Sequence, residues 1–372
     1  MNHRNPVPVA PRPVDSPSPR FRLAPATLIL LAALLSACTT VGPNYQAPQL
    51  STSQGRWSEP VMPGAEPADL ARWWASLGDP VLERLGETAL AQNLDLRQAA
   101  ARIDEARALR DRVAGAAQPS VGVGASVNRR QQSRNGPLPV DTVPGLEATQ
   151  TIYDAGFDAA WEIDLFGSQR RALESADAKL AMTEAEAQGV RMRVAVLGLG
   201  VLLGEPPEQE LALLDTVPAP LTLRSLPVGE RADILRRRPD VLAAERKLAA
   251  STADIGVATA ELFPKLSIGL GGGFQVLNSG DWFSSSSTRF SILPLISWRV
   301  FDGGRVRAEI RAREAQQQQA ALAYEQAVLA ALGDAERALA DYEAQLETLM
   351  RHWGALDANR RSFQHAQARY AA

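Results

Sequence analysis

The sequence predicts a mixed fold in which four membrane-length β-strands are set within a chain of long helices. In residues 265–276 the apolar side chains recur at every second position, which is the period of a strand with one apolar and one polar face. Each strand run is about ten residues long, the length that a tilted strand needs to cross a bilayer. The run from Arg305 to Tyr370 contains no proline and spaces its apolar residues in heptads, which predicts a long coiled-coil helix.

The N-terminal residues predict a secretion signal. Arginines precede an apolar run from Leu23 to Leu35, which ends in the sequence Leu35-Ser-Ala-Cys38. Basic residues, a short apolar run and small residues are typical of a signal peptide. Because Cys38 is the only cysteine in the chain, we expect residues 1–37 to be removed and Cys38 to carry a covalent lipid. The alternative is a buried free cysteine behind an anchor helix.

Proline spacing marks the next segments. Residues 38–78 are proline-rich and predict an extended, lipid-anchored linker. Asp79-Pro80 then starts a helix, because a capping side chain is followed by proline at the first helical position. A second apolar stripe begins at Asp95 and stops at Pro119. Residues 79–204 form the first of two predicted repeats.

Two strands are expected in the first repeat. Residues 120–130 switch to a period of two, and a polar loop follows over residues 129–145. The second strand is clearest over residues 156–165 and is predicted to end at Phe166-Gly167. A proline-free helical segment then runs from Ser168 to Leu203.

The second repeat, residues 230–372, has the same order of elements. The connector over residues 205–229 holds five of the chain's prolines and separates the repeats. A heptad stripe over residues 241–262 predicts a helix, and strands are expected at 265–276 and 289–300. The long helix from Arg305 closes the repeat.

The alternation assigns a face to each strand residue. We expect the apolar face to contact lipid and the polar face to line a lumen. The lipid-facing residues are Val121, Val123, Val127, Leu266, Ile268, Leu270, Phe274 and Val276, and the lumen-facing residues are Lys265, Ser267 and Gln275. Trp161 and Trp298 end corresponding strands and are predicted to anchor at the membrane interface, with ordinary core aromatics as the alternative.

Composition excludes several classes of function. The chain has a net charge of −3 and no basic stripe with interleaved aromatics, so no nucleic-acid partner is expected. His352 and His365 lie too far apart for a metal site, and the glycines of residues 269–273 lack the Gly-Lys-Ser of a phosphate loop. Arg236–Arg238 is expected on a solvated face or at a helix C-terminus. The sequence predicts no catalytic, metal-binding or cofactor-binding residues and hence no enzyme.

The chain resembles a known family, the outer-membrane factors of tripartite efflux pumps, which are NodT-type lipoproteins of TolC-like fold. Six motifs in chain order carry the resemblance, which covers nearly everything from Ala33 to Tyr370. They are Leu35-Ser-Ala-Cys-Thr-Thr-Val-Gly-Pro-Asn-Tyr45, Trp73-Trp74 through Pro80, Trp161-Glu-Ile-Asp-Leu-Phe-Gly167, Leu202-Leu-Gly-Glu-Pro-Pro207, Arg236-Arg-Arg-Pro-Asp240 and Phe301-Asp-Gly-Gly304.

The resemblance implies a homotrimer whose protomers each give four strands to one twelve-stranded barrel, above a helical tunnel in the periplasm. It also implies an outer-membrane exit duct for small molecules, served by an inner-membrane pump of the RND type and a periplasmic adaptor protein. Thr39, where retained lipoproteins carry Asp, implies export to the outer membrane of a Gram-negative bacterium.

Two departures from the family pattern keep other functions open. The segment from Ser168 to Leu203 is about half the family's length, and relatives continue past Tyr370 through a tip turn and a returning helix. No gate residue can therefore be transferred to this chain. The alternatives are a transport-incompetent structural lipoprotein and the exit duct of a type I protein secretion system.

Overall fold

The computed structural model describes residues 39–48, 57, 80–133, 147–194 and 235–370. The predicted signal peptide, Cys38 and the connector over residues 205–229 lie outside the described residues. The helices are α2 (Pro80–Gln92), α3 (Leu94–Ala116), α4 (Ser168–Val194), α8 (Pro239–Ala260), η4 (Ser285–Ser287) and α9 (Arg305–Tyr370). The strands are β1 (Ser120–Gln131), β2 (Thr149–Ile163), β3 (Lys265–Val276) and β4 (Thr288–Ser297).

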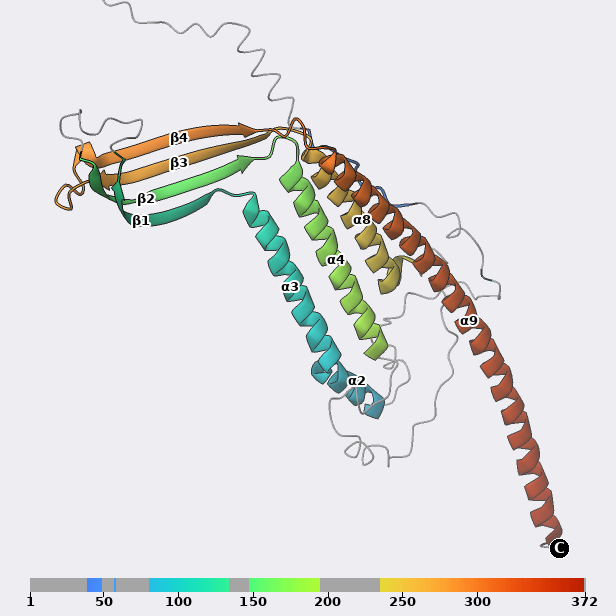
Figure 1. Cartoon of the computed structure of the whole chain (residues 1–372). Coiled ribbons are helices and arrows are strands. Elements are labelled where there is room, and N and C mark those ends of the chain that lie inside the picture. The colour runs from blue at the N-terminus through green and yellow to red at the C-terminus, as the bar shows by residue number, and fades with distance from the viewer. Residues whose placement is uncertain (1–38, 49–56, 58–79, 134–146, 195–234, 371–372) are drawn as a thin grey trace, which may run out of the picture. The chain divides into compact units, whose positions relative to one another are not determined.

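The four strands form one antiparallel sheet in the order β1-β2-β3-β4 (Figure 1). The predictions for β1 and β3 are confirmed to within a residue. Each half of the chain follows the order helix, strand, strand, helix, with α3 and α4 flanking the first strand pair and α8 and α9 the second. The sheet therefore joins two equivalent units that are distant in sequence.

The ends of β2 and β4 differ from the prediction. β2 stops at Ile163 instead of Phe166-Gly167, and β4 stops at Ser297, three residues before the expected end. Both strands end where their pairing with β3 ends, because β3 itself begins within one residue of the positions opposite Ile163 and Ser297. The chain then turns into the next helix through glycines with positive φ, Gly167 at 82° and Gly304 at 84°. The alternating pattern continues past the true strand ends because the turn residues are themselves partly apolar.

Aspartates at these two turns cap the helices that follow. The Asp164 carboxylate accepts the Arg170 backbone N–H at 3.0 Å at the start of α4. The Asp302 carboxylate accepts the backbone N–H groups of Gly304 and Val306, each at 2.9 Å, at the start of α9. These bonds satisfy helix N–H groups that have no partner within the helix, so the strand-to-helix turns are fixed.

The helices pack as neighbours in the order α3, α4, α8, α9 (Figure 1). Ion pairs link α3 to α4, with Arg110 Nε 2.8 Å from Asp177, and α4 to α8, with Lys179 Nζ 3.4 Å from Asp254. The predicted heptad of α8 is confirmed, since Val241, Leu248 and Ile255 are buried. Val241 joins Leu235, Val328 and Ala331 in a core cluster against which Tyr324 and Leu332 pack.

The C-terminal half of α9 is different, because its heptad side chains are exposed in the single chain. Trp353 is 66% exposed and Phe363 64%. No described helix contacts this part of α9 closely enough to cover the seam that the sequence pattern predicts. The N-terminal half of α9 is thus packed against its neighbours, and the C-terminal half presents an exposed apolar stripe.

Asp302 gives the α9 cap a defined pH dependence. Hydrogen bonds from backbone N–H groups, chiefly that of Val306, hold the pKa of Asp302 below its usual range. A carboxyl with a depressed folded-state pKa stabilises the fold above its unfolded pKa of about 3.9, and this contribution is lost as the pH falls through the folded value. Replacing Asp302 by Ala should therefore lower the thermal stability at pH 7.

The difference in melting temperature between the wild type and Asp302→Ala should shrink as the pH falls below about 4. Scanning calorimetry between pH 3 and 7 measures it. Asp357→Ala is the control, because Asp357 pairs with Arg361 on the exposed surface of the same helix and caps nothing. An equal difference at pH 3 and pH 7 would contradict the capping role of Asp302.

Candidate functional site

The strand register gathers the apolar side chains on one face of the sheet. Residues directly opposite each other in an antiparallel pair point to the same side, so Val121, Ala159, Leu270 and Ile292 form one row across all four strands. All eight residues predicted to face lipid share this face: Val121, Val123, Val127, Leu266, Ile268, Leu270, Phe274 and Val276. Val123 is 88% exposed, and a continuous exposed apolar face of this kind marks an interaction surface.

Val276 is a correction to the predicted lipid contacts. It lies on the apolar face but is only 4% exposed. At this end of β3 the following loop turns back onto the sheet, and the Phe283 ring packs edge-on against Phe274 with centroids 5.1 Å apart. The strand pattern placed Val276 on the correct face, but it could not show that the loop after β3 turns back over this end of the strand.

The opposite face is polar and carries a charged network across three strands. Lys265, Ser267 and Gln275, the residues predicted to line a lumen, all lie on it. The Arg289 guanidinium of β4 lies 2.7 Å from Asp154 Oδ1 of β2. Gln275 Nε2 of β3 donates to the other carboxylate oxygen of Asp154 at 3.1 Å.

Gly273 makes this network possible. It lies opposite Arg289 in the register, so the Arg289 side chain reaches across β3 to Asp154 over a position that has no side chain. A Cβ atom at Gly273 would lie 2.3 Å from the Ala155 carbonyl oxygen, which is backbone that cannot move aside cheaply. The glycine-rich stretch of β3 is therefore explained by close strand approach and not by a phosphate loop.

Lys265 does not extend alone from the polar face. Its ammonium pairs with Glu261, which follows the end of α8. The other carboxylate oxygen of Glu261 lies 2.8 Å from Arg299, just beyond β4. These three charges tie the base of β3 and β4 to the helix end.

The two tryptophans make equivalent hydrogen bonds at this junction. Trp161 Nε1 donates to the Ala117 carbonyl at 3.0 Å, immediately after α3. Trp298 Nε1 donates to the Leu262 carbonyl at 2.9 Å, just after α8. Trp161 is 42% exposed and Trp298 57%, so neither is an ordinary core aromatic. Their contact with the membrane interface stays a prediction.

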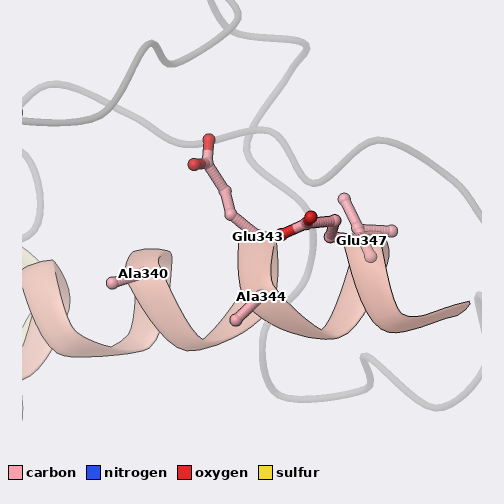
Figure 2. A pocket seen from close by; sticks show the side chains of 5 residues that line it. Ala340, Glu343, Ala344 and Glu347 are labelled. Carbon is pink, nitrogen blue, oxygen red and sulfur yellow. The ribbon is translucent and has the colours of Figure 1, made fainter. Parts of the chain in front are cut away.

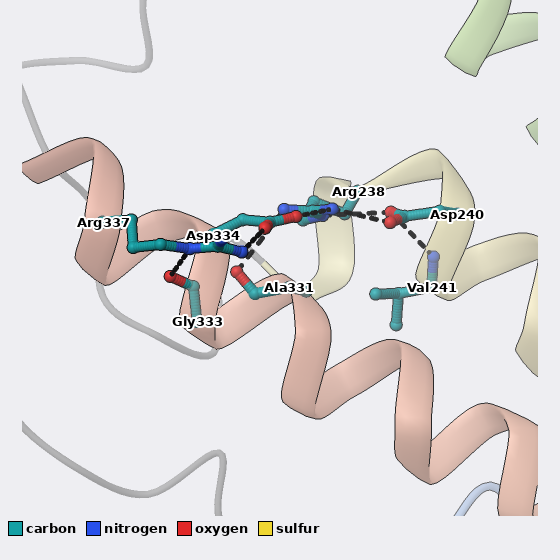
Figure 3. Close-up of polar contacts among 7 residues, drawn as sticks. All are labelled: Arg238, Asp240, Val241, Ala331, Gly333, Asp334 and Arg337. Atoms are coloured by element: carbon teal, nitrogen blue, oxygen red, sulfur yellow. Dashed lines mark hydrogen bonds and ion pairs between the residues drawn. The ribbon is translucent and has the colours of Figure 1, made fainter.

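Arg238 holds the start of α8 against α9 (Figure 3). Its guanidinium donates to Asp240 at 2.6 Å and 3.0 Å and to Asp334 of α9 at 3.0 Å, and Arg337 also donates to Asp334 at 2.5 Å. The hydrogen bonds from Arg238 hold the pKa of Asp240 below its usual range. The expected place of this basic cluster, on a solvated face or at a helix C-terminus, is confirmed for Arg236 and Arg237, which are exposed at the end of a helical stretch. It is wrong for Arg238, which precedes the N-terminus of α8 and bridges two helices.

A hollow on α9 offers little for recognition. Figure 2 shows it along one side of the helix, lined by Ala340, Glu343, Ala344, Leu346 and Glu347. All five residues come from a single helix, so the hollow is not enclosed. Among the residues that the structure describes, no group of three His, Cys, Asp or Glu side chains is placed to hold a metal ion. None of the described helices is both long and apolar enough to span a membrane.

Sequence reasoning missed Asp154, Arg289 and Arg238. Alternation could have placed Asp154 and Arg289 on the polar face, but their pairing depends on the register of strands that are distant in sequence. Arg238 was noticed only as part of a basic cluster. Its partner Asp334 lies on another helix, and nothing in the local pattern connects the two.

A family model, known proteins and solved structures that are similar to this chain all point to one family. The family model described as "Outer membrane efflux protein" matches residues 85–196 and 231–372. The pyoverdine export outer membrane protein OpmQ of Pseudomonas putida is 29% identical, covering 93% of this chain and 87% of the relative. The outer membrane protein OprJ of Pseudomonas aeruginosa is 27% identical, covering 92% and 85%.

The outer-membrane channel OprN has a similar solved structure, with a TM-score of 0.72 and 32% identity over 89% of both chains. By their names, these relatives are an export protein of the outer membrane, an outer membrane protein and an outer-membrane channel, and the matching family is one of efflux proteins and not of enzymes. The chain belongs to the outer membrane efflux protein family.

Proposed function

We propose that three copies of this chain form one twelve-stranded barrel and act as the passive exit duct of a tripartite efflux system in the outer membrane. The observation that carries the proposal is the sheet itself, with one apolar face, one charged face and, in the described part of the chain, no partner strand beyond β1 or β4. Unpaired backbone groups at a sheet edge are costly in lipid, by several kcal/mol each, so the edges must pair with other copies.

The polar face supports three copies over two. An eight-stranded barrel has an interior that its own side chains fill. The ion pair of Asp154 with Arg289 and the polar residues around it require water, which a twelve-stranded barrel can hold. The helices α3, α4, α8 and α9 would then continue the wall as a tunnel in the periplasm. A wide polar lumen selects little, so transport would be driven by an RND-type inner-membrane pump through a periplasmic adaptor.

A second candidate function is a structural lipoprotein that no longer conducts. Two observations favour it. Heptad side chains in the C-terminal half of α9, such as Trp353 and Phe363, are exposed in the single chain. The alignment with OpmQ runs over 419 positions, more than the 372 residues of this chain, so the chain lacks segments that this relative has. A tunnel wall that lacks these segments would leave the apolar stripe in the C-terminal half of α9 uncovered.

Conductance and complementation separate the two functions. The duct predicts single-channel conductance from the purified protein in planar bilayers, a trimer by native mass spectrometry, and restored drug resistance in a strain without its own outer-membrane factor. The structural lipoprotein predicts outer-membrane protein with neither conductance nor resistance. Arg289→Ala is expected to change ion selectivity without preventing assembly, because it removes a lumen charge while Gln275 still donates to Asp154.

The two faces of β3 should respond differently to arginine. Ile268→Arg places a charge on the lipid face and should destabilise the barrel by about 2–4 kcal/mol if it lies near the bilayer midplane. Ser267→Arg is the matched control on the neighbouring residue, where the side chain faces the lumen directly opposite Glu162. Reversible unfolding from lipid vesicles measures both variants, and similar losses at positions 267 and 268 would reject the assigned faces.

Cys38 should carry the covalent lipid in the mature protein. Acyl chains add membrane affinity of about 0.8 kcal/mol per buried methylene group, and the same processing removes residues 1–37. Intact-mass analysis of membrane-extracted protein should give the mass of residues 38–372 plus the lipid. An unmodified chain that retains its first residues would refute the assignment.

A further inference from the structure

A short segment near the N-terminus is docked on the helices. We call residues Thr40–Tyr45 the strap. The Val41 backbone N–H donates to the Phe166 carbonyl at 3.1 Å, at the turn between β2 and α4. The Tyr45 hydroxyl donates to Glu245 Oε1 of α8 at 3.0 Å. Burial beside Glu245 raises the pKa of Tyr45, which keeps the hydroxyl protonated as a donor.

Arg171 of α4 is the central contact of the strap. It is only 2% exposed. Its Nε donates to the Val41 carbonyl at 3.0 Å, and one terminal nitrogen donates to the Gly42 carbonyl at 3.1 Å and to Asn44 Oδ1 at 2.7 Å. The other terminal nitrogen donates to Glu174 at 2.7 Å, which balances the charge.

Glycines permit this close approach from all three sides. Gly42 has a φ of +87°, and a Cβ atom there would lie 2.4 Å from Gly256 Cα of α8. A Cβ atom at Gly256 would lie 2.7 Å from the Arg171 side chain, and one at Gly167 would lie 2.7 Å from Thr40. At these three positions a side chain larger than hydrogen would block the close contact between the strap and the helices.

Packing of α4 against α8 does not by itself require an arginine. A buried guanidinium is costly to desolvate, and it is tolerated only when hydrogen-bond acceptors surround it. Three of the four acceptors of Arg171 belong to the strap, so undocking of the strap would leave Glu174 as the one remaining acceptor among those described. The side chain is thus matched to the docked strap.

We propose that Arg171 is a positioning residue that latches the strap onto α4 and α8 and so fixes where the lipid anchor leaves the protein. Cys38 precedes Thr40 by two residues, which span at most about 7 Å when extended. Thr40 itself contacts Gly167, in the turn between β2 and α4. This inference rests on the proposed lipidation of Cys38. It assigns to Arg171 the role of setting where the lipid anchor lies along the protein, and hence relative to the membrane.

Two variants release the strap in independent ways. Arg171→Lys keeps the positive charge but lacks the planar fork that reaches several acceptors at once. Gly42→Ala acts from the strap side, through the clash with Gly256 and the strained φ, and leaves the helices unchanged. Lys179→Gln is the matched control, because it removes the ion pair between α4 and α8 without touching the strap.

Hydrogen exchange by mass spectrometry on the full lipidated protein reports docking through the Val41 N–H. In the wild type the peptide covering residues 39–48 should be protected. Arg171→Lys and Gly42→Ala should each speed its exchange by at least roughly tenfold, the effect of losing a net hydrogen bond, while Lys179→Gln should not. A spin label at Gln46→Cys, an exposed position, should become mobile in the first two variants and stay ordered in the third.

Fast exchange over residues 39–48 in the wild type, or unchanged protection in both Arg171→Lys and Gly42→Ala, would overturn the latch. Equal loosening in Lys179→Gln would also overturn it, because the effect would then belong to helix packing. If intact mass shows no lipid on Cys38 while exchange still follows this pattern, the anchor proposal fails and strap docking stands. The two failures are therefore distinguishable.

Discussion

The register of the four strands is the constraint on which the rest of the structure depends. Side chains alternate along a strand, so a slip of one residue would move every apolar side chain to the charged face. The register is held where one strand cannot shift without a clash, as where Gly273 passes the Ala155 carbonyl. The pairing of Asp154 with Arg289 spans β2 to β4 and exists only in this register. The apolar face, the charged network and the close backbone approach at Gly273 therefore all depend on the same strand register.

The junction between the sheet and the helices is built from equivalent contacts in both halves of the chain. Asp164 and Asp302 cap the helices that leave the sheet, and Trp161 and Trp298 bond the carbonyls that end the helices entering it. Each strand pair is therefore tied at its base to the helix before it and the helix after it. The orientation of a strand pair is transmitted to two helices by short, direct contacts.

The sequence pattern predicted the local elements well and the long-range contacts poorly. Alternation located β1 and β3, and the heptads located α8 and α9, because both periods are set by neighbouring residues. The distant partners of Arg171, Arg238 and Arg289 were not predictable, because Val41, Asp334 and Asp154 each lie at least 96 residues away along the chain. The ends of β2 and β4 were not predictable, because they depend on where the pairing with β3 stops, and apolar alternation continues past them.

The strap also constrains the order in which the protein can fold. Tyr45 and Glu245 are 200 residues apart, and the Arg171 contacts close a loop of about 130 residues. Contacts of such large sequence separation form late, because the entropy of closing the loop is lost before they contribute. The strap contacts both α4 and α8, so its full set of contacts can form only after these two helices have packed together. Residues 40–45 are therefore among the last of the described residues to reach their final place.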